Sequence, residues 1–200
     1  MMVRMNIRKL LPTEVRELQD HLERLDPEDR TRRFMGTVDV GGIRRHCQSL
    51  DWLQSILLGY FDAGVLRGVA ELQLQDGRPG FTCEVAVTVE TQWQGQGIGT
   101  ELLRRGLLLA RNRSAREVQL NCFADNYKIQ HIVHKWGVPI HHDLGASDAR
   151  IPLEPPTYWS LCEEMMGEGM GWLTFWSEGA GRAIAGCGAA ATAAATSAGS

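Results

Sequence analysis

Three glycines at alternate positions constrain this chain more than any other feature of its sequence. Gly95, Gly97 and Gly99 lie between an alternating apolar run that ends at Val89 and a leucine-rich run that begins at Ile98. Glycine loses more backbone freedom on folding than any other residue, so it is favoured where the backbone needs positive φ or close approach to a ligand. The pattern therefore predicts a strand that leads into a helix through a loop whose N–H groups converge on a ligand.

A glycine loop before a helix suits a phosphate group, because a helix N-terminus offers unpaired N–H donors and a partial positive charge. A Walker loop ends in Gly-Lys-Ser/Thr, whereas this chain continues as Gly99-Thr100-Glu101, so we exclude that loop. A dinucleotide fingerprint is G-x-G-x-x-G in a parallel βαβ unit, but this loop is G-x-G-x-G after strands that look antiparallel. Glu117 lies near the distance expected for a ribose contact, which keeps the dinucleotide alternative open.

The region before the loop shows the residue pattern of β-strands separated by turns. "ILLGYFD", "VLRGVAELQLQ" and "FTCEVAVTV" are separated by "AG" and "DGRPG", which predicts an antiparallel meander of three strands. In the third run the odd-numbered residues from Phe81 to Val89 share one face, and Glu84 and Thr88 lie on the other. The leucine-rich run predicts a helix from about Gly97 to Asn112.

Helical spacing is clearest near the start of the chain. In "IRKLLPTEVRELQDHLERL" apolar residues recur on one helical face from Val15 to Leu25, with Thr13 available as the N-cap. "DPEDRTRRF" predicts a second short helix with Pro27 in its first turn, and residues 43–53 give an ambiguous helical signal.

Downstream of the leucine-rich helix, strand and helix patterns alternate again. "EVQLNCF" predicts a strand, and "NYKIQHIVHKWG" predicts a helix with Ile132, Val133 and Trp136 turned inward and Gly137 as its stop. "PIHHDL" and "ARIPLEP" are expected to close a final hairpin.

Composition excludes several classes of protein. The chain is 44% hydrophobic and 22% charged, as in ordinary globular proteins, and its net charge of −3 argues against a nucleic-acid binder. Local basic residues, Arg30, Arg32 and Arg33, remain candidate contacts for a small anionic ligand. The five cysteines form no C-x-x-C pair, no signal peptide is evident and no window is apolar enough for a membrane. We expect a cytoplasmic protein with reduced thiols.

Two further segments of the sequence can be compared, together with the loop, with patterns of known families. Gln94 to Gly99 resembles the Q/R-x-x-G-x-G/A loop of the GNAT N-acetyltransferase superfamily, and "DNYKIQHIVHKWGV" resembles the block that follows it in that family. "LDPEDRTRRF" resembles L-S-P-E-x-x-x-x-R-F, found near the start of acetyltransferase domains of the bacterial protein-lysine acetyltransferase type. The resemblance covers roughly residues 5–155.

The resemblance implies a fold and a domain plan. It implies an α+β fold of three layers, in which a mixed, mostly antiparallel sheet is flanked by helices. The GNAT domain would span residues 1–155, followed by a helical extension over 156–178 and a disordered low-complexity tail over 179–200. The aromatic residues of the extension are expected to pack a C-terminal helix or to form the face of a homodimer.

The resemblance also implies acetyl-CoA as co-substrate. The backbones of Val87 and Val89 would pair with the pantetheine arm, and Asn126 would lie at its end, although asparagine is equally a favoured helix N-cap. The main-chain N–H groups of the loop would hold the pyrophosphate. These loop residues are Gln94, Gly95, Gln96, Gly97, Ile98, Gly99 and Thr100.

The implied reaction is direct transfer of an acetyl group to an amine. An alkyl amine is only about one part in a thousand neutral at physiological pH, so a base must take its proton. Glu84 is the expected base, since "CEVAVTV" resembles the strand that carries a catalytic glutamate in lysine-acetylating relatives; the alternative is a solvated glutamate on a half-buried strand. Many GNAT enzymes have a tyrosine seven residues after the asparagine as acid for the thiolate, and here that position holds Val133.

Several alternatives stay open. The acceptor is expected to be a protein lysine, with a small amine or amino acid as the alternative. The missing tyrosine makes a non-catalytic acyl-CoA-binding module a third candidate. We expect no metal site, because His141, His142 and Asp143 lack a suitably spaced further ligand, and no nucleophilic role for Cys122 on its apolar strand.

Overall fold

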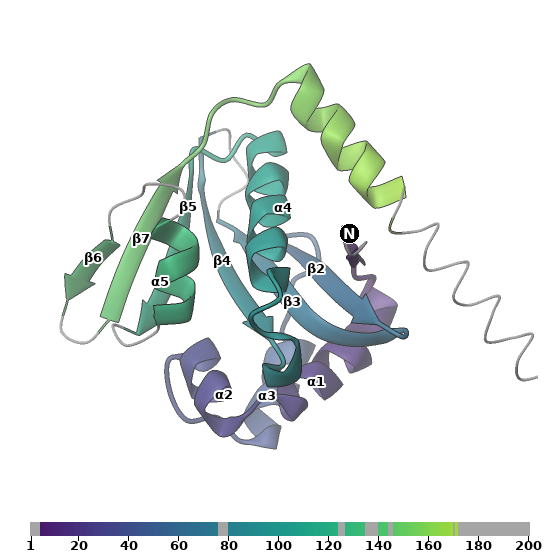
Figure 1. Ribbon diagram of the computed structural model, residues 1–200, viewed down its shortest axis with the longest axis vertical. Coiled ribbons are helices and arrows are strands. Elements are labelled where there is room, and N and C mark those ends of the chain that lie inside the picture. Colours follow the sequence, from purple (N-terminus) through teal and green to yellow (C-terminus); the bar gives the residue numbers. More distant parts are fainter. Residues whose placement is uncertain are drawn as a thin grey trace, which may run out of the picture.

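One sheet organises the described part of the chain, and helices pack against both of its faces (Figure 1). The computed structural model describes residues 5–75, 80–123, 127–134, 140–143, 146–169 and 171. The strands are β1 (Asn6–Lys9), β2 (Ser55–Asp62), β3 (Val65–Leu74), β4 (Thr82–Val89), β5 (Glu117–Phe123), β6 (Ile140–Asp143) and β7 (Ala146–Pro152). The helices are α1 (Val15–Arg24), α2 (Pro27–Phe34), α3 (Val40–Gln48), α4 (Ile98–Asn112) and α5 (Tyr127–His134), with 3₁₀ turns η1 (Pro12–Glu14) and η2 (Thr91–Trp93).

The described strands are arranged in the order β1-β2-β3-β4-β5-β7-β6. All neighbouring strands are antiparallel except β4 and β5, which are parallel and are joined through α4. A parallel pair needs a crossover connection, and the leucine-rich helix supplies it. The prediction of a mixed, mostly antiparallel sheet flanked by helices is confirmed.

Alternation along the central strands produces a core on each face of the sheet. Helix α4 packs Leu102 and Leu103 against Ala70 and Leu72 of β3 on one face. On the other face, α1 and α3 cover a second cluster that includes Val69. Successive side chains of a strand point to opposite faces, so a strand covered on both faces is apolar at even and odd positions alike.

The start of the chain differs from the expectation. The segment before the first predicted helix, which carried no prediction of its own, forms strand β1. In this strand Arg8 is buried at 2% exposure and stacks 4.0 Å from the centre of the Phe61 ring. The guanidinium of Arg8 also binds the Glu14 carboxylate at 2.6 Å and 2.8 Å. Thr13 lies inside η1 and does not cap α1, whose N-cap residue is Glu14. A four-residue strand containing a buried arginine has no local signal, because its partners come from elsewhere in the chain.

Most other predicted elements are confirmed. Strands β2 to β5, helices α2 and α4, and the closing β6–β7 hairpin lie where the sequence patterns placed them. Helix α3 begins earlier than the ambiguous signal suggested, because the Asp39 side chain accepts a hydrogen bond from the Gly42 N–H at 2.7 Å and caps it.

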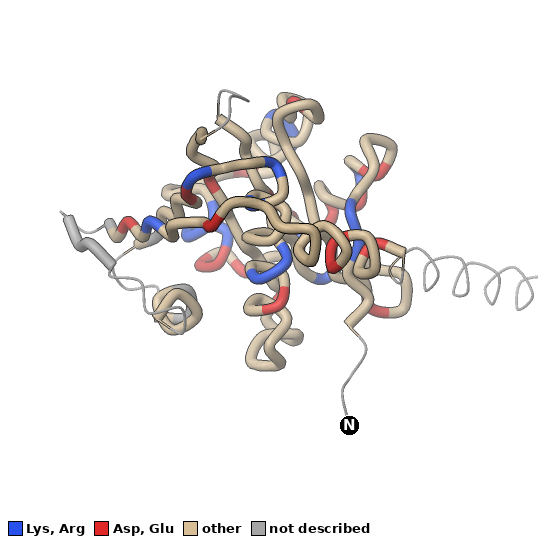
Figure 2. Tube along the Cα trace, turned by 90° about the horizontal axis from the view of Figure 1, so that it is seen from above, with Lys and Arg blue, Asp and Glu red and all other residues tan. Residues whose placement is uncertain are grey.

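The C-terminal part of the described chain is a helix over residues 158–169. Residues 172–200 lie outside the described part of the chain, so the division into extension and tail stays a prediction. Within the described residues, no helix combines the length and the apolar character needed to cross a bilayer. Figure 2 shows basic and acidic residues interspersed along the trace, in agreement with the small net charge.

Replacing Leu102 by alanine is expected to destabilise the fold. Leu102 is fully buried between α4 and β3, so the change removes buried methyl groups and leaves a cavity. We expect the free energy of unfolding to fall by about 2–5 kcal/mol, measured by urea denaturation. Leu53→Ala is the control, because Leu53 is 89% exposed, and it is expected to change the free energy by less than about 0.5 kcal/mol. Equal effects of the two changes would contradict the assigned core.

Candidate functional site

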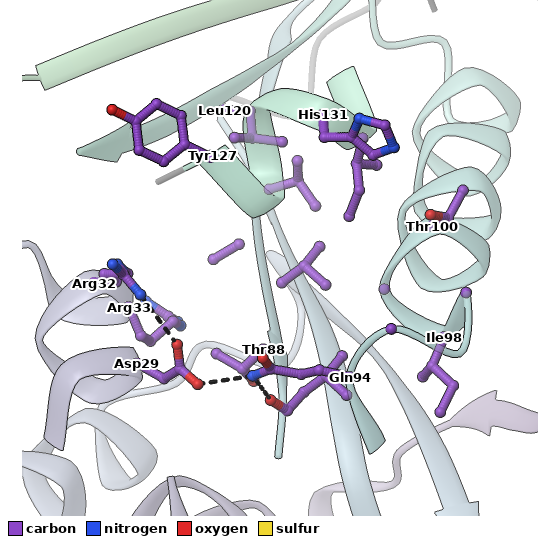
Figure 3. Close-up of a pocket in the computed structure, with 18 of the residues that line it drawn as sticks. Asp29, Arg32, Arg33, Thr88, Gln94, Ile98, Thr100, Leu120, Tyr127 and His131 are labelled. Atoms are coloured by element: carbon purple, nitrogen blue, oxygen red, sulfur yellow. Dashed lines mark hydrogen bonds and ion pairs between the residues drawn. The ribbon is translucent and has the colours of Figure 1, made fainter. Parts of the chain in front are cut away.

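The central strands separate at one point, and a cavity lies beyond it. Strand β4 pairs with β3 from Cys83 to Val89, but its parallel pairing with β5 covers only Thr82 to Glu84. Beyond Glu84 a cavity of about 580 Å³ is bounded by β4 on one side and β5 on the other (Figure 3). The residues that line it are Asp29, Arg32, Arg33, Val85, Ala86, Val87, Thr88, Val89, Gln94, Gly95, Gly97, Ile98, Gly99, Thr100, Leu120, Asn121, Tyr127, His131 and Ile132.

The backbone of β4 presents hydrogen-bonding groups to this cavity. The Gln75 N–H donates to the Thr82 carbonyl and the Glu90 N–H donates to the Arg67 carbonyl, so even-numbered residues of β4 face β3. Because the direction alternates along an antiparallel strand, the N–H and C=O groups of Val87 and Val89 point to the β5 side. The separation of β4 from β5 leaves that side to the cavity.

The glycine loop adopts the conformation that its sequence predicts. Gly95 and Gly97 have φ angles of 73° and 82°, in the left-handed region that favours glycine, and Gly97 is the N-cap residue of α4. No side chain caps this helix, so the first-turn N–H groups, including those of Gly99 and Thr100, are directed out of the helix end. A Cβ on Gly99 would lie 3.5 Å from Ile132 and 3.7 Å from Val89, which places Gly99 in the wall between two lining side chains.

Gln94 connects this loop to two other elements. Its amide nitrogen donates to the Val89 carbonyl at 2.8 Å and to the Asp29 carboxylate of α2 at 2.7 Å. Figure 3 shows Asp29, Arg32 and Arg33 on one side of the cavity and Thr100 and His131 on the other. Gln96 behaves differently, since it is exposed, donates to the Gln92 carbonyl at 3.1 Å and is not one of the described lining residues.

A buried polar network surrounds Glu90, which lies between the end of β4 and the glycine loop. Arg24 and Arg67 each donate to its carboxylate at 2.9 Å, and His21 lies 3.1 Å from it through Nδ1. The other ring nitrogen of His21 is 2.9 Å from the Thr88 hydroxyl. Burial lowers the pKa of His21, so the ring is neutral; Nδ1–H then donates to Glu90 and Nε2 accepts from Thr88.

Glu90 itself stays ionised in this network. Burial alone would raise its pKa, but the hydrogen bonds from His21, Arg24 and Arg67 lower it overall. The network joins α1, β3 and β4 directly before the glycine loop. Nothing in the sequence pattern indicated it, because His21 occupies an ordinary position of an amphipathic helix.

A second buried carboxylate lies beneath α2 and α3. Arg33 donates to Glu71 of β3 at 2.6 Å, and His46 of α3 lies 3.1 Å from the same oxygen. Burial would raise the pKa of Glu71, but the hydrogen bond from His46 and the positive charge of Arg33 lower it to about 2. Arg33 is therefore held in place by Glu71 while it lines the cavity.

Glu84 lies where β4 and β5 separate. It is the last β4 residue paired with β5, and the next residue, Val85, already lines the cavity. Its carboxylate accepts a hydrogen bond from the Asn121 amide at 3.2 Å, and Asn121 is itself a lining residue. Glu84 is thus adjacent to the cavity through Asn121 and Val85 without being one of the described lining residues.

Helix α5 forms the remaining wall. Tyr127, His131 and Ile132 line the cavity, whereas Val133 is fully buried in the core. Asn126 lies outside the described residues, and so do the side chains of His141, His142 and Asp143. Among the side chains that the structure describes, no group of three His, Cys, Asp or Glu is arranged to hold a metal ion.

The structure therefore brings most of the residues expected to contact a ligand into one cavity and places further residues in its lining. The contacts along Val87, Val89 and the loop meet in one cavity, except for Gln96. Of the basic residues flagged in the sequence, Arg32 and Arg33 line it, while Arg30 donates to the Glu23 and Leu25 carbonyls. The sequence did not indicate the other lining residues, because their elements approach the loop only in the fold. These residues are Asp29, Leu120, Asn121, Tyr127, His131 and Ile132.

Comparison with known proteins agrees with this geometry. The family model described as the acetyltransferase (GNAT) family matches residues 16–138. No curated protein matches the sequence. The GNAT domain of S. lividans PAT is similar in structure, with a TM-score of 0.65, 18% identity and coverage of 76% of this chain and 95% of that one.

Two further solved structures are similar at the same level. The Salmonella typhimurium acetyltransferase yncA, solved with acetyl-CoA, has a TM-score of 0.58 and 18% identity, and the match covers 78% of this chain and 97% of that one. A GNAT-family acetyltransferase from Streptococcus pneumoniae has a TM-score of 0.57 and 17% identity, with coverage of 76% and 100%. At these identities the structural matches show the fold.

Stability is expected to depend on pH through Glu71. Its pKa in the folded protein is about 2, below the ordinary value of 4.5, so its contribution is present above pH 4.5 and is lost as pH falls towards 2. We expect the difference in unfolding free energy between the wild type and Glu71→Gln to shrink by about 3 kcal/mol over that window, measured by urea denaturation at each pH. Glu28→Gln is the control, because Glu28 is 74% exposed. Parallel curves for the wild type and Glu71→Gln would contradict the assignment.

Proposed function

Because the chain belongs to the GNAT acetyltransferase family, we propose that it transfers an acetyl group from acetyl-CoA to a primary amine, the side chain of a protein lysine. The observation that carries the proposal is the opening of β4 from β5 beyond Glu84, with the N-terminus of α4 at its edge. A diphosphate and an extended amide chain are the two chemical groups that such a site would accommodate.

The residues present fit acetyl-CoA. The first-turn N–H groups of α4 and the left-handed Gly97 would hold the pyrophosphate, and the small Gly99 keeps the wall open. The backbones of Val87 and Val89 would bind the pantetheine amides as an added strand does. The Val89 carbonyl already accepts from Gln94, but a carbonyl oxygen has two lone pairs and accepts a second donor.

The proposed contacts of Gln96 and Asn126 with acetyl-CoA have less structural support than the others. The exposed side chain of Gln96 points to a contact through its main chain alone. Asn126 stays a proposed contact at the pantetheine end, on the strength of the family resemblance.

The acceptor amine must lose a proton before it can attack the acetyl group, so the reaction needs a general base. We assign the general base to Glu84, whose carboxylate is oriented by the Asn121 amide beside the cavity. A backbone N–H group of β4 that faces the cavity would stabilise the oxyanion that develops on the transferred acetyl group.

The thiolate that leaves needs a proton donor other than residue 133. Val133 is fully buried and has no donor. Tyr127 and His131 lie on the same helix, line the cavity and each carry a side-chain group that can donate a proton.

The choice of a protein lysine as acceptor rests on helix α2, which comes from the N-terminal part of the chain. The segment from Leu25 to Phe34, which resembles protein-lysine acetyltransferases, forms α2 and supplies Asp29, Arg32 and Arg33 to the cavity. A small-molecule amine remains the second candidate acceptor, since α2 alone does not define its size. A non-catalytic acyl-CoA-binding module is the third candidate, and the burial of Val133 is the observation that favours it. We also propose a cytoplasmic location, supported by the free thiols of Cys47 and Cys83.

Glu84→Gln is expected to slow turnover strongly while acetyl-CoA still binds. The amide keeps the shape of the carboxylate and its contact with Asn121 but cannot accept the proton, so kcat should fall by about 10²–10⁴-fold. Free-thiol release with lysine-bearing peptides and with small amines gives the rate, and calorimetry gives the affinity for acetyl-CoA. Glu154→Gln, on a carboxylate that is 84% exposed, is the control. Unchanged turnover in Glu84→Gln would refute the assigned base, and no turnover by the wild type with any amine would favour the binding module.

Gly99→Val tests the proposed pyrophosphate site at the N-terminus of α4. A valine side chain would extend between Ile132 and Val89 into the wall of the cavity, so we expect the Kd for acetyl-CoA to rise at least about tenfold, measured by calorimetry. Gly36→Val is the control, because a Cβ at Gly36 would meet no atom within 4 Å. If Gly99→Val folds and binds acetyl-CoA as the wild type does, the pyrophosphate lies elsewhere.

A further inference from the structure

The helix over residues 158–169 presents its apolar side chains to solvent. Tyr158, Trp159, Met165 and Met166 are 72–79% exposed, and Leu161 is 45% exposed. They recur at spacings of three, four and seven residues, so they form one stripe along the helix. In an ordinary surface helix such a stripe faces the core, whereas in this helix it faces the solvent.

The polar side of the helix is fixed to the body, which prevents it from turning over. The Ser160 hydroxyl donates to Asn112 at 2.6 Å, and Glu164 accepts from Asn112 at 2.8 Å and from Arg113 at 2.9 Å. Lys9 of β1 also binds Glu164, at 3.1 Å. Burial alone would raise the pKa of Glu164, but the hydrogen bonds from Asn112 and Arg113 lower it overall. The outward stripe is therefore a fixed surface of the fold.

We propose that this stripe packs against the same stripe of a second copy of the chain, forming a two-fold symmetric dimer. The exposed area of its five large side chains is on the order of 600 Å², since aromatic side chains alone bury 150–250 Å² each when covered. That area approaches the roughly 800 Å² per partner of a standard stable interface. It also equals or exceeds the largest apolar patch of a typical monomer.

Two-fold symmetry suits the order of residues in the stripe. An antiparallel pair of these helices would place Tyr158 and Trp159 of one copy opposite Met165 and Met166 of the other. Thioether sulfur makes favourable contacts with aromatic rings, so the two halves of the stripe are complementary to each other. Tyr158 and Trp159 already contact each other edge to face, with ring centres 5.9 Å apart.

The charges favour a second protein surface over a lipid surface. Residues 154–169 contain four glutamates and no lysine or arginine, and an amphipathic helix that binds anionic membranes is normally basic. Each glutamate is paired within the same chain: Glu154 with Arg111, Glu163 with Arg104, Glu164 with Arg113 and Glu168 with Lys9. Two copies can therefore approach without strong repulsion between their helices.

The stripe lies away from the proposed catalytic cavity. The helix is held by Asn112 and Arg113 at the C-terminal end of α4, whereas the cavity adjoins Gly99 and Thr100 at the other end. Dimerisation through the stripe should therefore leave acetyl-CoA binding unchanged, and the two proposals can fail separately.

The mass of the full chain in solution tests the dimer. By sedimentation equilibrium up to about 100 µM, we expect twice the 22.2 kDa of one chain. Trp159→Glu combined with Met166→Glu should give the monomer, because charges would be buried in the interface. Leu53→Glu, at a side chain that is 89% exposed elsewhere, should leave the dimer intact.

A thermal melt and calorimetry with acetyl-CoA on the double variant show whether it folds. Trp159→Ser with Met166→Ser is the milder replacement if the charged variant unfolds, and it should weaken the dimer at least about tenfold. A wild type that stays monomeric over this range would overturn the proposal. A dimer that survives both double replacements would overturn it too, as would binding of the wild type to anionic vesicles that the replacement abolishes.

Discussion

Strand β4 is paired with β3 along its length but with β5 only from Thr82 to Glu84. Buried backbone N–H and C=O groups require hydrogen-bond partners, so a strand that leaves its neighbour inside a sheet must be satisfied by solvent, by side chains or by a ligand. Here Gln94 donates to the Val89 carbonyl, and the cavity occupies the rest of the opening. The separation of two central strands thus creates both the space and the hydrogen-bonding surface on which the proposed binding of acetyl-CoA rests.

Two buried carboxylates hold that opening in shape. Glu90 joins α1, β3 and β4 directly before the glycine loop. Glu71 holds Arg33 of α2, which lines the cavity, and also contacts His46 of α3. An ionised carboxylate in the interior is stable only with close partners, and each of these two has at least one arginine within hydrogen-bond distance. Both clusters lie on the face of the sheet opposite α4. The glycine loop and the N-terminus of α4 are therefore supported by polar contacts on the opposite face of the sheet.

Helix α4 connects the two surfaces for which we propose partners. Its uncapped N-terminus, after Gly97, adjoins the cavity, and its last turn carries Asn112 and Arg113, which hold the outward-facing helix over residues 158–169. A helix is a rigid connection of about 1.5 Å per residue, so its two ends can serve separate partners without interfering. In the arrangement that we propose, the GNAT domain would carry out the chemistry and the helix over residues 158–169 would supply the surface for association.

Elements with a local cause could be predicted from the amino-acid sequence. The alternation in β2 to β4, the leucine pattern of α4 and the glycines at positive φ all follow from side-chain period and backbone sterics. Features that depend on residues far apart in the chain could be read only from the fold. They include the Asp29–Gln94 contact, the burial of Arg8 in β1 and the pairing of His21 with Thr88 and Glu90. Periodicity shows which face of an element is buried, but not which element covers it. A polar residue on a covered face has no signal until its partner is in place.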